Sequence, residues 1–349
     1  MNNIASLDAA HPLQPYWDLT LASVQADALR VALETRLFSH LRVPLSAPAL
    51  AARLQLHPAN TGYLLELLWS MGLLQRQGEA GTGYHYRAAA VASRYLADES
   101  SDYCGDAWVF RLRALRHFGG QLDEQLRSGR PGPSAPNLNG SVANWAAAAR
   151  LQIAQEQRAV TAAAALAVMQ RVPEFPQTRR LLDLGGGPGL VAIALAEANP
   201  GLSGEVFDYP ETAAVAQQNI DRAGLDGRLS VRGGDLLSDA IGEGYDLIWC
   251  SSVLHFVADV GATLSMIHAA LRPGGVLVCA HAEIPPTAAA ALQVMPYYLS
   301  MRMLGRHVSV AGGLCAALQK TGFVSIDCFE QVAFAMAPVA VQVARRALS

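Results

Sequence analysis

A glycine-rich turn and three aspartates are the residues of this sequence best suited to binding a ligand. The stretch LLDLGGGPG, residues 181–189, places Asp183 two residues before Gly185. Glycines at a strand-to-helix turn let a ligand approach the backbone closely. Asp208 in VFDYP and Asp235 in GGD each follow a later apolar run. The pattern predicts a nucleotide- or nucleoside-binding site with a carboxylate at three strand ends.

Two kinds of cofactor compete for this turn. A dinucleotide fingerprint, G-x-G-x-x-G, needs a third glycine where Leu190 stands, and it gives no reason for a carboxylate beside a diphosphate. A cofactor with a cationic amino acid end and no phosphates fits Asp183 better, and S-adenosylmethionine is such a molecule. Asp208 would then accept from both ribose hydroxyls, and Asp235 would face the adenine amino group. We therefore expect an S-adenosylmethionine site.

The elements that must position these residues alternate between apolar strands and helices from residue 179 onward. Such alternation predicts an α/β fold, in which helices cover both faces of a mostly parallel, Rossmann-like sheet. Ligands bind to such sheets at the carboxyl ends of the strands. The expected strands are RRLLDLG, GEVFDYP, RLSVRGGD, YDLIWCSS, GGVLVCAHAE, FVSIDCF and VAFAMA, with helices from Leu190, from about Glu211 and over 260–271.

The first 175 residues carry apolar residues mostly at helical spacing, so we expect a helical domain over 1–175 and the cofactor domain over 176–349. Two helices in SAPALAARLQLHP and TGYLLELLWSMGLL precede a hairpin-like stretch, GEAGTGYHYRAAA. This order predicts an all-α domain with a winged-helix-like part. The second helix has Glu66 as its one charged residue, whereas a DNA-reading helix presents Arg, Lys or Asn. We expect a packing and dimerisation domain and no nucleic-acid partner.

The bulk composition excludes several other classes of partner. With 349 residues, 52% of them hydrophobic, and a net charge of −3, the chain has no electrostatic attraction for nucleic acid or anionic membranes. No window reaches about 18 unbroken apolar residues, so we expect no membrane span. The first twelve residues lack the basic start and apolar core of a secretion signal. The five cysteines show no C-x-x-C pairing, so we expect buried, reduced thiols in a cytoplasmic protein.

Together these motifs resemble the class I S-adenosylmethionine-dependent methyltransferases, and specifically the small-molecule O-methyltransferase family of plant caffeate and bacterial secondary-metabolism type. LLDLGGGPG…FDYP is similar to that family's cofactor segment, RGGDLL to its GDFF, and SSVLHFVAD…LRPGGVLV to the segment around its catalytic histidine. The N-terminal stretch PAL…YLLELLWSMGLL is similar to its dimerisation domain. The resemblance covers nearly the whole chain and implies a homodimeric enzyme that methylates a small-molecule acceptor.

The resemblance also implies roles for particular residues. His255, in SSVLHFVAD, matches the family's general base, which takes the proton of an acceptor hydroxyl while the oxygen attacks the sulfonium methyl in line. The acceptor is expected to be an aromatic or acidic hydroxyl, held by an apolar wall of Trp145, Met295, Tyr298 and Met301. The expected cofactor-binding residues are Asp183, Gly185, Gly187, Asp208, Asp235, Leu236 and Ser251.

The neighbourhood of His255 departs from the family's pattern. Phe256 stands where the family has Asp, and His281 and His307 stand where it has acidic residues, with Glu283 the alternative to His281 after a small slip in register. Three hypotheses follow. His255 remains the base, with His281 and His307 as its catalytic neighbours; or the three imidazoles hold a metal such as Zn²⁺; or the altered site uses S-adenosylmethionine for a reaction other than methyl transfer.

Overall fold

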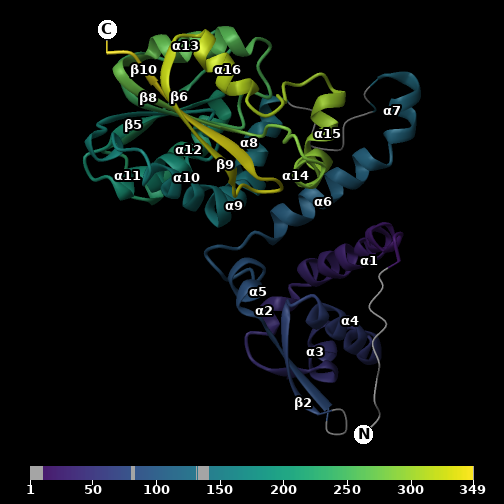
Figure 1. The fold of residues 1–349 in the computed structure, drawn as a ribbon. Coiled ribbons are helices and arrows are strands. Elements are labelled where there is room, and N and C mark those ends of the chain that lie inside the picture. The colour runs from purple at the N-terminus through teal and green to yellow at the C-terminus, as the bar shows by residue number, and fades with distance from the viewer. Residues whose placement is uncertain (1–10, 80–82, 131, 133–140, 349) are drawn as a thin grey trace, which may run out of the picture. The chain divides into compact units, whose positions relative to one another are not determined.

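The structure, a computed structural model, describes residues 11–79, 83–130, 132 and 141–348 (Figure 1). Contacts divide the chain into two compact units, Met1–Leu112 and Arg113–Ser349. The boundary that we expected near residue 175 lies inside the second unit, where the chain passes from helices into the large sheet. The expected boundary near residue 175, between a helical domain and a cofactor-binding domain, remains a prediction.

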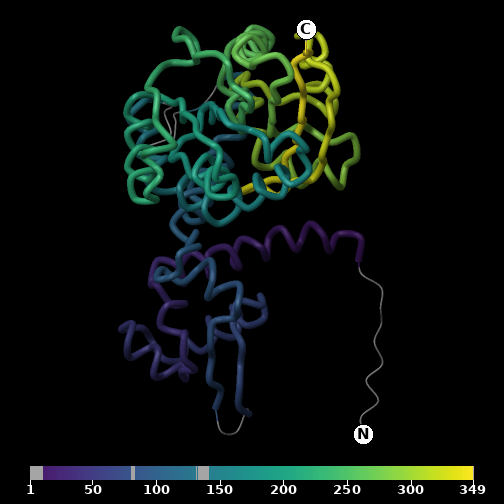
Figure 2. Tube along the Cα trace, turned by 90° about the vertical axis from the view of Figure 1, so that its left-hand side faces the viewer, coloured from purple at the N-terminus to yellow at the C-terminus, as the bar shows by residue number. Residues whose placement is uncertain are grey.

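The first unit combines helices with a small antiparallel sheet in the order β1-β3-β2. Figure 2 shows the hairpin of β2 and β3 projecting from the helices of this unit. The side chain of Ser46 caps α3 by accepting from the N–H of Ala49, as its sequence position predicts. The elements are α1 (Gln14–Glu34), α2 (Leu37–His40), β1 (Leu45–Ser46), α3 (Ala47–Leu54), α4 (Pro58–Ser70), β2 (Leu74–Glu79), β3 (Gly83–Ala88) and α5 (Ala90–Tyr95).

This arrangement confirms the winged-helix-like pattern, with one correction. The unit is not all-α, because β1 pairs with β3 and extends the hairpin into three strands. Glu66 of α4, the one charged residue on the candidate recognition helix, forms an ion pair with Arg76 and accepts from the hydroxyl of Tyr86, both on the hairpin. The charge therefore holds helix and hairpin together, as suits a packing domain.

The second unit consists of helices around one seven-stranded sheet. Its helical elements are α7 (Leu122–Ser128), α8 (Val142–Arg150), α9 (Gln152–Glu156), the π-helix η1 (Gln157–Thr161), α10 (Ala162–Met169), the short 3₁₀ helix η2 (Phe175–Gln177), α11 (Leu190–Ala198), α12 (Pro210–Arg222), α13 (Val260–Ala270), α14 (Ala288–Leu292), α15 (Met295–Met303) and α16 (Gly313–Lys320), while α6 (Gly105–Gly119) spans the division between the units. Its strands are β4 (Arg180–Leu184), β5 (Ser203–Asp208), β6 (Leu229–Gly233), β7 (Tyr245–Ser251), β8 (Leu271–His281), β9 (Phe323–Val332) and β10 (Val339–Arg346).

The sheet has the order β6-β5-β4-β7-β8-β10-β9, in which β10 runs antiparallel to both of its neighbours and the other pairings are parallel. Helices α10, α11 and α12 pack on one face, and α13 and α16 pack on the other (Figure 1). Because both faces are covered, central strands such as β7 are buried almost throughout. The predicted α/β class is confirmed, and Asp183, Asp208 and Ser251 all lie at the carboxyl edge of the sheet.

Two expected elements differ from the structure. The Ala-rich stretch 144–170, which by its composition we expect to form one long helix, is interrupted at Leu151 (φ −117°, ψ −86°) and continues through the π-helical turn η1. The last strand occupies Val339–Arg346 rather than 332–337, because the apolar side chains of Val339, Val341 and Val343 fill the core beside β8.

Two further expectations concern the state of the cysteines and the presence of membrane-spanning helices. All five cysteines are free thiols, but only Cys250 and Cys279 are buried, because Cys104 and Cys315 are half-buried and Cys328 is exposed. Across the part of the chain that the structure describes, no helix has the length and apolar character needed to cross a membrane.

Candidate active site

The glycine turn after β4 adopts a backbone conformation that requires glycine. Gly185, Gly187 and Gly189 all have positive φ, at 66°, 59° and 75°. A Cβ on Gly185 would lie 2.3 Å from a methyl group of Val253. The turn is therefore packed directly against the loop that carries His255.

Asp183 supplies an unpaired carboxylate oxygen at this turn. The residue is 1% exposed, and its Oδ2 has no hydrogen-bond partner among the described residues. Burial raises the pKa of Asp183 to about 7, opposed by a backbone hydrogen bond from Ala192, and the nearby charge of Asp208 adds to the rise. A buried carboxylate without a cation is costly, so this position fits the cationic end of S-adenosylmethionine.

Asp208 joins the end of β5 to the glycine turn. Its Oδ2 accepts from the N–H of Gly187 at 2.9 Å, and its Oδ1 accepts from the N–H of Tyr209 at 2.8 Å. Burial raises the pKa of its carboxyl group, and these two backbone donors oppose the rise. Each oxygen keeps a further lone pair, so the carboxylate fits the expected role of accepting from ribose hydroxyls.

The other expected cofactor residues lie at the ends of the neighbouring strands. Asp235 caps a turn after β6, since its Oδ1 accepts from the N–H of Leu237 at 2.9 Å. Leu236 packs against the apolar core on the α13 side of the sheet. Ser251 ends β7, and its hydroxyl accepts from the indole N–H of Trp249 at 3.1 Å. Of these three, Ser251 lies nearest the glycine turn in register, because β7 pairs with β4.

Gln157, which belongs to no recognisable motif, fixes the glycine turn from η1. Its Nε2 donates to the carbonyl of Gly186 at 3.1 Å, and its Oε1 accepts from the N–H of Leu190 at 3.1 Å. The side chain is buried, and from the first residue of η1 it bridges the glycine turn to Leu190, the first residue of α11. No side-chain spacing in the Ala-rich stretch predicts a π-helix, so only the three-dimensional structure identifies Gln157.

His255 lies after β7 with one ring nitrogen held and the other unpaired. Its Nδ1 donates to the backbone carbonyl of His307 at 2.6 Å, and because a carbonyl only accepts, the proton must be on Nδ1. Nε2 is buried without a partner among the described residues. Burial lowers the pKa of His255, and the charge of His307 lowers it further against the effect of the hydrogen bond. The neutral ring therefore presents its basic lone pair at Nε2.

The other two histidines take different positions from those we expected. The Nε2 of His281 accepts from the backbone N–H groups of Val253 and Leu254, and its Nδ1 lies 3.3 Å from the sulfur of Cys279. The side chain of His307 is exposed, and its residue contributes its carbonyl rather than its ring. His281 and His307 therefore both lie near His255, but the ring of His281 is occupied by other contacts and His307 contacts His255 through its carbonyl.

The three-histidine metal site is not assembled. Among the described residues, the group whose donor atoms lie within 4.8 Å of one another is Cys250, Cys279 and His281. Glu283, the alternative at the first acidic position, accepts from Ser309, Gly312, Leu314 and Gln342, at 2.8 to 3.3 Å. Its carboxylate anchors the start of α16 and is fully engaged there.

The surroundings of the base are aromatic. The ring of Tyr298, 5% exposed on α15, has its centroid 5.1 Å from that of His255. Phe256 packs edge-on against Trp145 of α8, with ring centroids 5.0 Å apart, and the guanidinium of Arg306 lies 5.3 Å from the Phe256 centroid. Phe256 thus replaces the family's carboxylate with an aromatic bridge between α8 and the loop after α15.

The remaining expected acceptor residues lie on α15. Met301 packs against the main core, and the sulfur of Met295 contacts Arg302 at 3.9 Å. A pocket of about 660 Å³ opens beside the loop that follows His255, and it is lined by residues 257–261, 302 and 305–308. Because this lining includes Arg302 and Arg306 together with Asp259, the pocket offers charged groups of both signs to a ligand.

Two protein-family profiles match this chain. The profile of the O-methyltransferase domain matches residues 143–323, and that of the O-methyltransferase dimerisation domain matches residues 17–98. The chain belongs to the S-adenosylmethionine-dependent O-methyltransferase family and is an enzyme of that family.

Individual relatives agree with this assignment. The chain is 29% identical to 3-hydroxy-5-methyl-1-naphthoate 3-O-methyltransferase of Streptomyces sahachiroi, over 68% of this chain and 67% of the relative. It is 30% identical to the N,N-dimethyltransferase OxyT of Streptomyces rimosus, over 74% and 75%. The crystal structure of human N-acetylserotonin methyltransferase in complex with S-adenosylmethionine has the same fold, with a TM-score of 0.79, 21% identity, and coverage of 98% of this chain and 100% of that one.

Proposed function

We propose that the enzyme transfers the methyl group of S-adenosylmethionine to a hydroxyl group of a small aromatic metabolite, with Nε2 of His255 as the general base. The observation that carries this proposal is the state of the His255 ring. Its Nδ1 is held at 2.6 Å by the carbonyl of His307, and its Nε2 is buried with no partner among the described residues. This is the tautomer that a base needs, since the free lone pair points away from the anchored side.

S-adenosylmethionine supplies, when bound, an electrophilic methyl group on a positively charged sulfur and leaves as S-adenosylhomocysteine. His255 takes the proton of the acceptor hydroxyl as the oxygen forms its bond to the methyl carbon. The His307 carbonyl then stabilises the imidazolium through the Nδ1–H bond, the role that a carboxylate has in related pairs. The proton passes to solvent after the methyl ether leaves.

The cofactor residues are proposed from their positions at the sheet edge. The unpaired oxygen of Asp183 would bind the cationic amino group, and Asp208 would bind the ribose hydroxyls. Gly185 and Gly187 would allow the close backbone approach, while Asp235, Leu236 and Ser251 would surround the nucleoside from the next strands.

Aromatic residues around His255 support an aromatic acceptor. Tyr298 and the pair formed by Trp145 and Phe256 offer ring faces and edges, which stack well on a flat ligand. Met295 and Met301 on the same helix as Tyr298 add adaptable apolar surface. The relative from Streptomyces sahachiroi acts on a naphthoate, and Arg302 and Arg306 in the pocket beside the loop after His255 support including such carboxylated phenols among the acceptors.

A mass-spectrometric assay tests this function. Purified enzyme is incubated with S-adenosylmethionine and a panel of phenols, carboxylated phenols and arylamines, the last because OxyT is an N,N-dimethyltransferase. We expect a product heavier by one methylene unit together with S-adenosylhomocysteine, and loss of the product in the His255→Gln enzyme. Release of methylthioadenosine, or an isomerised acceptor with no cofactor consumed, would establish the alternative in which this site performs other chemistry.

We also propose a homodimer, on the basis of the dimerisation domain and of exposed apolar side chains on α1. Helix α1 leaves large apolar side chains 50–70% exposed on the described part of the chain: Tyr16, Trp17, Leu19, Leu21 and Val24. Figure 2 shows α1 extending away from the remainder of the first unit. So many exposed large apolar side chains on one helix are unusual on a monomer, so a second copy is the expected cover.

A further inference from the structure

The loop that carries the base is fixed to the end of β8. Residues 252–255, which we call the base loop, begin with Ser252 at φ +58°, a left-handed conformation that a non-glycine residue adopts only when its surroundings impose it. The N–H of Ser252 donates to the carbonyl of Ala280 at 3.0 Å. The next two N–H groups, of Val253 and Leu254, donate to Nε2 of His281 at 3.0 and 2.9 Å.

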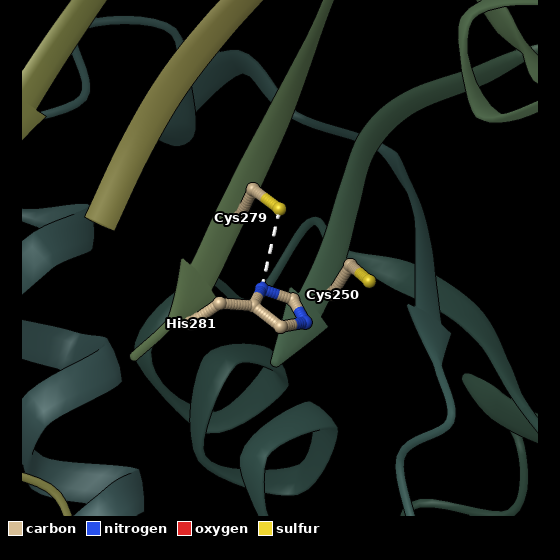
Figure 3. A group of neighbouring side chains, drawn as sticks. All are labelled: Cys250, Cys279 and His281. Carbon is tan, nitrogen blue, oxygen red and sulfur yellow. Dashed lines mark hydrogen bonds between the residues drawn. The ribbon is translucent and has the colours of Figure 1, made fainter. Parts of the chain in front are cut away.

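These bonds determine the protonation of His281. Because Nε2 accepts from two donors, it carries no hydrogen, and the single proton of the neutral ring lies on Nδ1. Figure 3 shows Nδ1 directed at the sulfur of Cys279 on the same strand, at 3.3 Å. Burial lowers the pKa of His281 well below its ordinary value, and the nearby His255 and His307 lower it further. His281 therefore stays neutral in this one tautomer.

The same tautomer argues against a metal at the Cys250, Cys279 and His281 group. A cation between the two sulfurs and Nδ1 would have to displace the Nδ1 proton and leave an imidazolate, while Nε2 kept its backbone donors. A hydrogen bond with Cys250, and then burial, raise the pKa of the Cys279 thiol, which opposes the thiolate that a metal needs. The cluster in Figure 3 is suited to hydrogen bonding and not to metal binding.

We propose that His281 is a positioning residue for the base: by accepting from Val253 and Leu254, it fixes the base loop so that Nε2 of His255 faces the acceptor. The inference rests on the proposed role of His255. It replaces the direct catalytic role that we expected for His281, because both of its ring nitrogens already contact protein groups. The loop also packs through Val253 against Gly185, so His281 holds the base in register with the cofactor turn.

Two substitutions that differ by one methylene group test this proposal. In His281→Gln the side-chain oxygen reaches the position of Nε2 and can accept from the loop, whereas in His281→Asn it reaches only the position of Nδ1. We expect His281→Asn to lower kcat by about tenfold to a hundredfold, with the KM for S-adenosylmethionine nearly unchanged, because a small displacement of a reacting group has that effect. His281→Gln should recover most of kcat.

Equal kcat in the native, Gln and Asn enzymes would overturn the proposal, as would ¹⁵N histidine spectra of the native protein that place the His281 proton on Nε2. His268→Gln serves as the matched control and should leave kcat unchanged, since His268 packs on Phe323 away from the base loop. The His255→Gln enzyme separates this inference from the proposed function. If that enzyme keeps full activity, the assignment of the base fails, whereas full activity in His281→Asn alone removes only the positioning role.

Discussion

The single hydrogen bond from His255 to a backbone carbonyl explains how the proposed base keeps its orientation without the carboxylate that its family has next to it. A carbonyl stabilises imidazolium less than a carboxylate does, so the base is weaker. Burial also lowers the pKa of His255, so both effects weaken the base. A weak base suits an acceptor whose hydroxyl is already acidic, such as a phenol conjugated to an electron-withdrawing group.

The pH dependence of kcat/KM follows from this shift. As the proposed base, His255 acts only when neutral, so activity should fall as the pH decreases through its pKa, which burial places below about 6.5. We expect full activity at neutral pH and an acid limb centred below the ordinary histidine value. A pH series with circular dichroism at each point checks that the fold survives. An acid limb centred above the ordinary value would contradict the assignment.

The raised pKa of Asp183 leads to a second prediction, which concerns how the stability of the fold depends on pH. Its pKa in the folded protein is about 7, above the ordinary value of about 3.9. Between these values the folded state binds more protons than the unfolded state, so stability should fall as pH rises. Without cofactor, the native Tm should therefore decrease from about pH 5 to about pH 8, whereas Asp183→Asn should change less.

The same substitution tests cofactor binding. If Asp183 pairs with the amino group of S-adenosylmethionine, Asp183→Asn should weaken binding by about tenfold to a hundredfold, as the loss of a charge-assisted hydrogen bond does. Isothermal titration calorimetry measures the affinity, and thermal denaturation measures the Tm. A variant that binds as well as the native protein would remove Asp183 from the site.

Among the elements, the π-helix η1 has the clearest functional consequence. A π-helical turn shifts the residues after it around the helix axis, and here Gln157 begins that turn with both ends of its amide on the glycine turn. Gln157→Leu removes both bonds at nearly constant volume. We expect S-adenosylmethionine to bind about tenfold more weakly in the variant.

The control for this prediction is Gln170→Leu, the same substitution at an exposed position beyond α10. It should leave the affinity unchanged. Equal affinities in the two variants would show that the glycine turn holds its conformation without η1.

The elements also show where sequence reasoning succeeds and where it fails. The strands β4, β7 and β8 were predictable because a strand buried on both faces is a nearly unbroken apolar run. The ends of β4, β5 and β7 located Asp183, Asp208 and the base loop. The break at Leu151 and the π-helix were not, because an Ala-rich sequence satisfies an α-helix equally well. The contact of His255 was hidden for another reason: its partner is a main-chain carbonyl, which leaves no trace in residue type.

For the whole molecule, the testable property is the oligomeric state. The proposed dimer would cover the apolar side chains of α1, so charges placed there should prevent assembly. We expect the native protein to sediment as a dimer and a Leu19→Glu, Leu21→Glu double variant as a monomer. A matched double substitution at Glu79 and Arg87 of the hairpin, each to Gln, should remain dimeric. A dimeric Leu19, Leu21 variant would place the interface elsewhere.

His255 is held by the backbone carbonyl of residue 307, and every amino acid that can occupy this position has that carbonyl. The side chain there is exposed, so substitutions can accumulate at that position while the base keeps its orientation. If this pocket admits the acceptor, evolution can reshape its mouth through residue 307 while the proposed base keeps its hydrogen bond. A saturation library at position 307, screened across acceptors, would find new substrate preferences among enzymes that all keep an intact base.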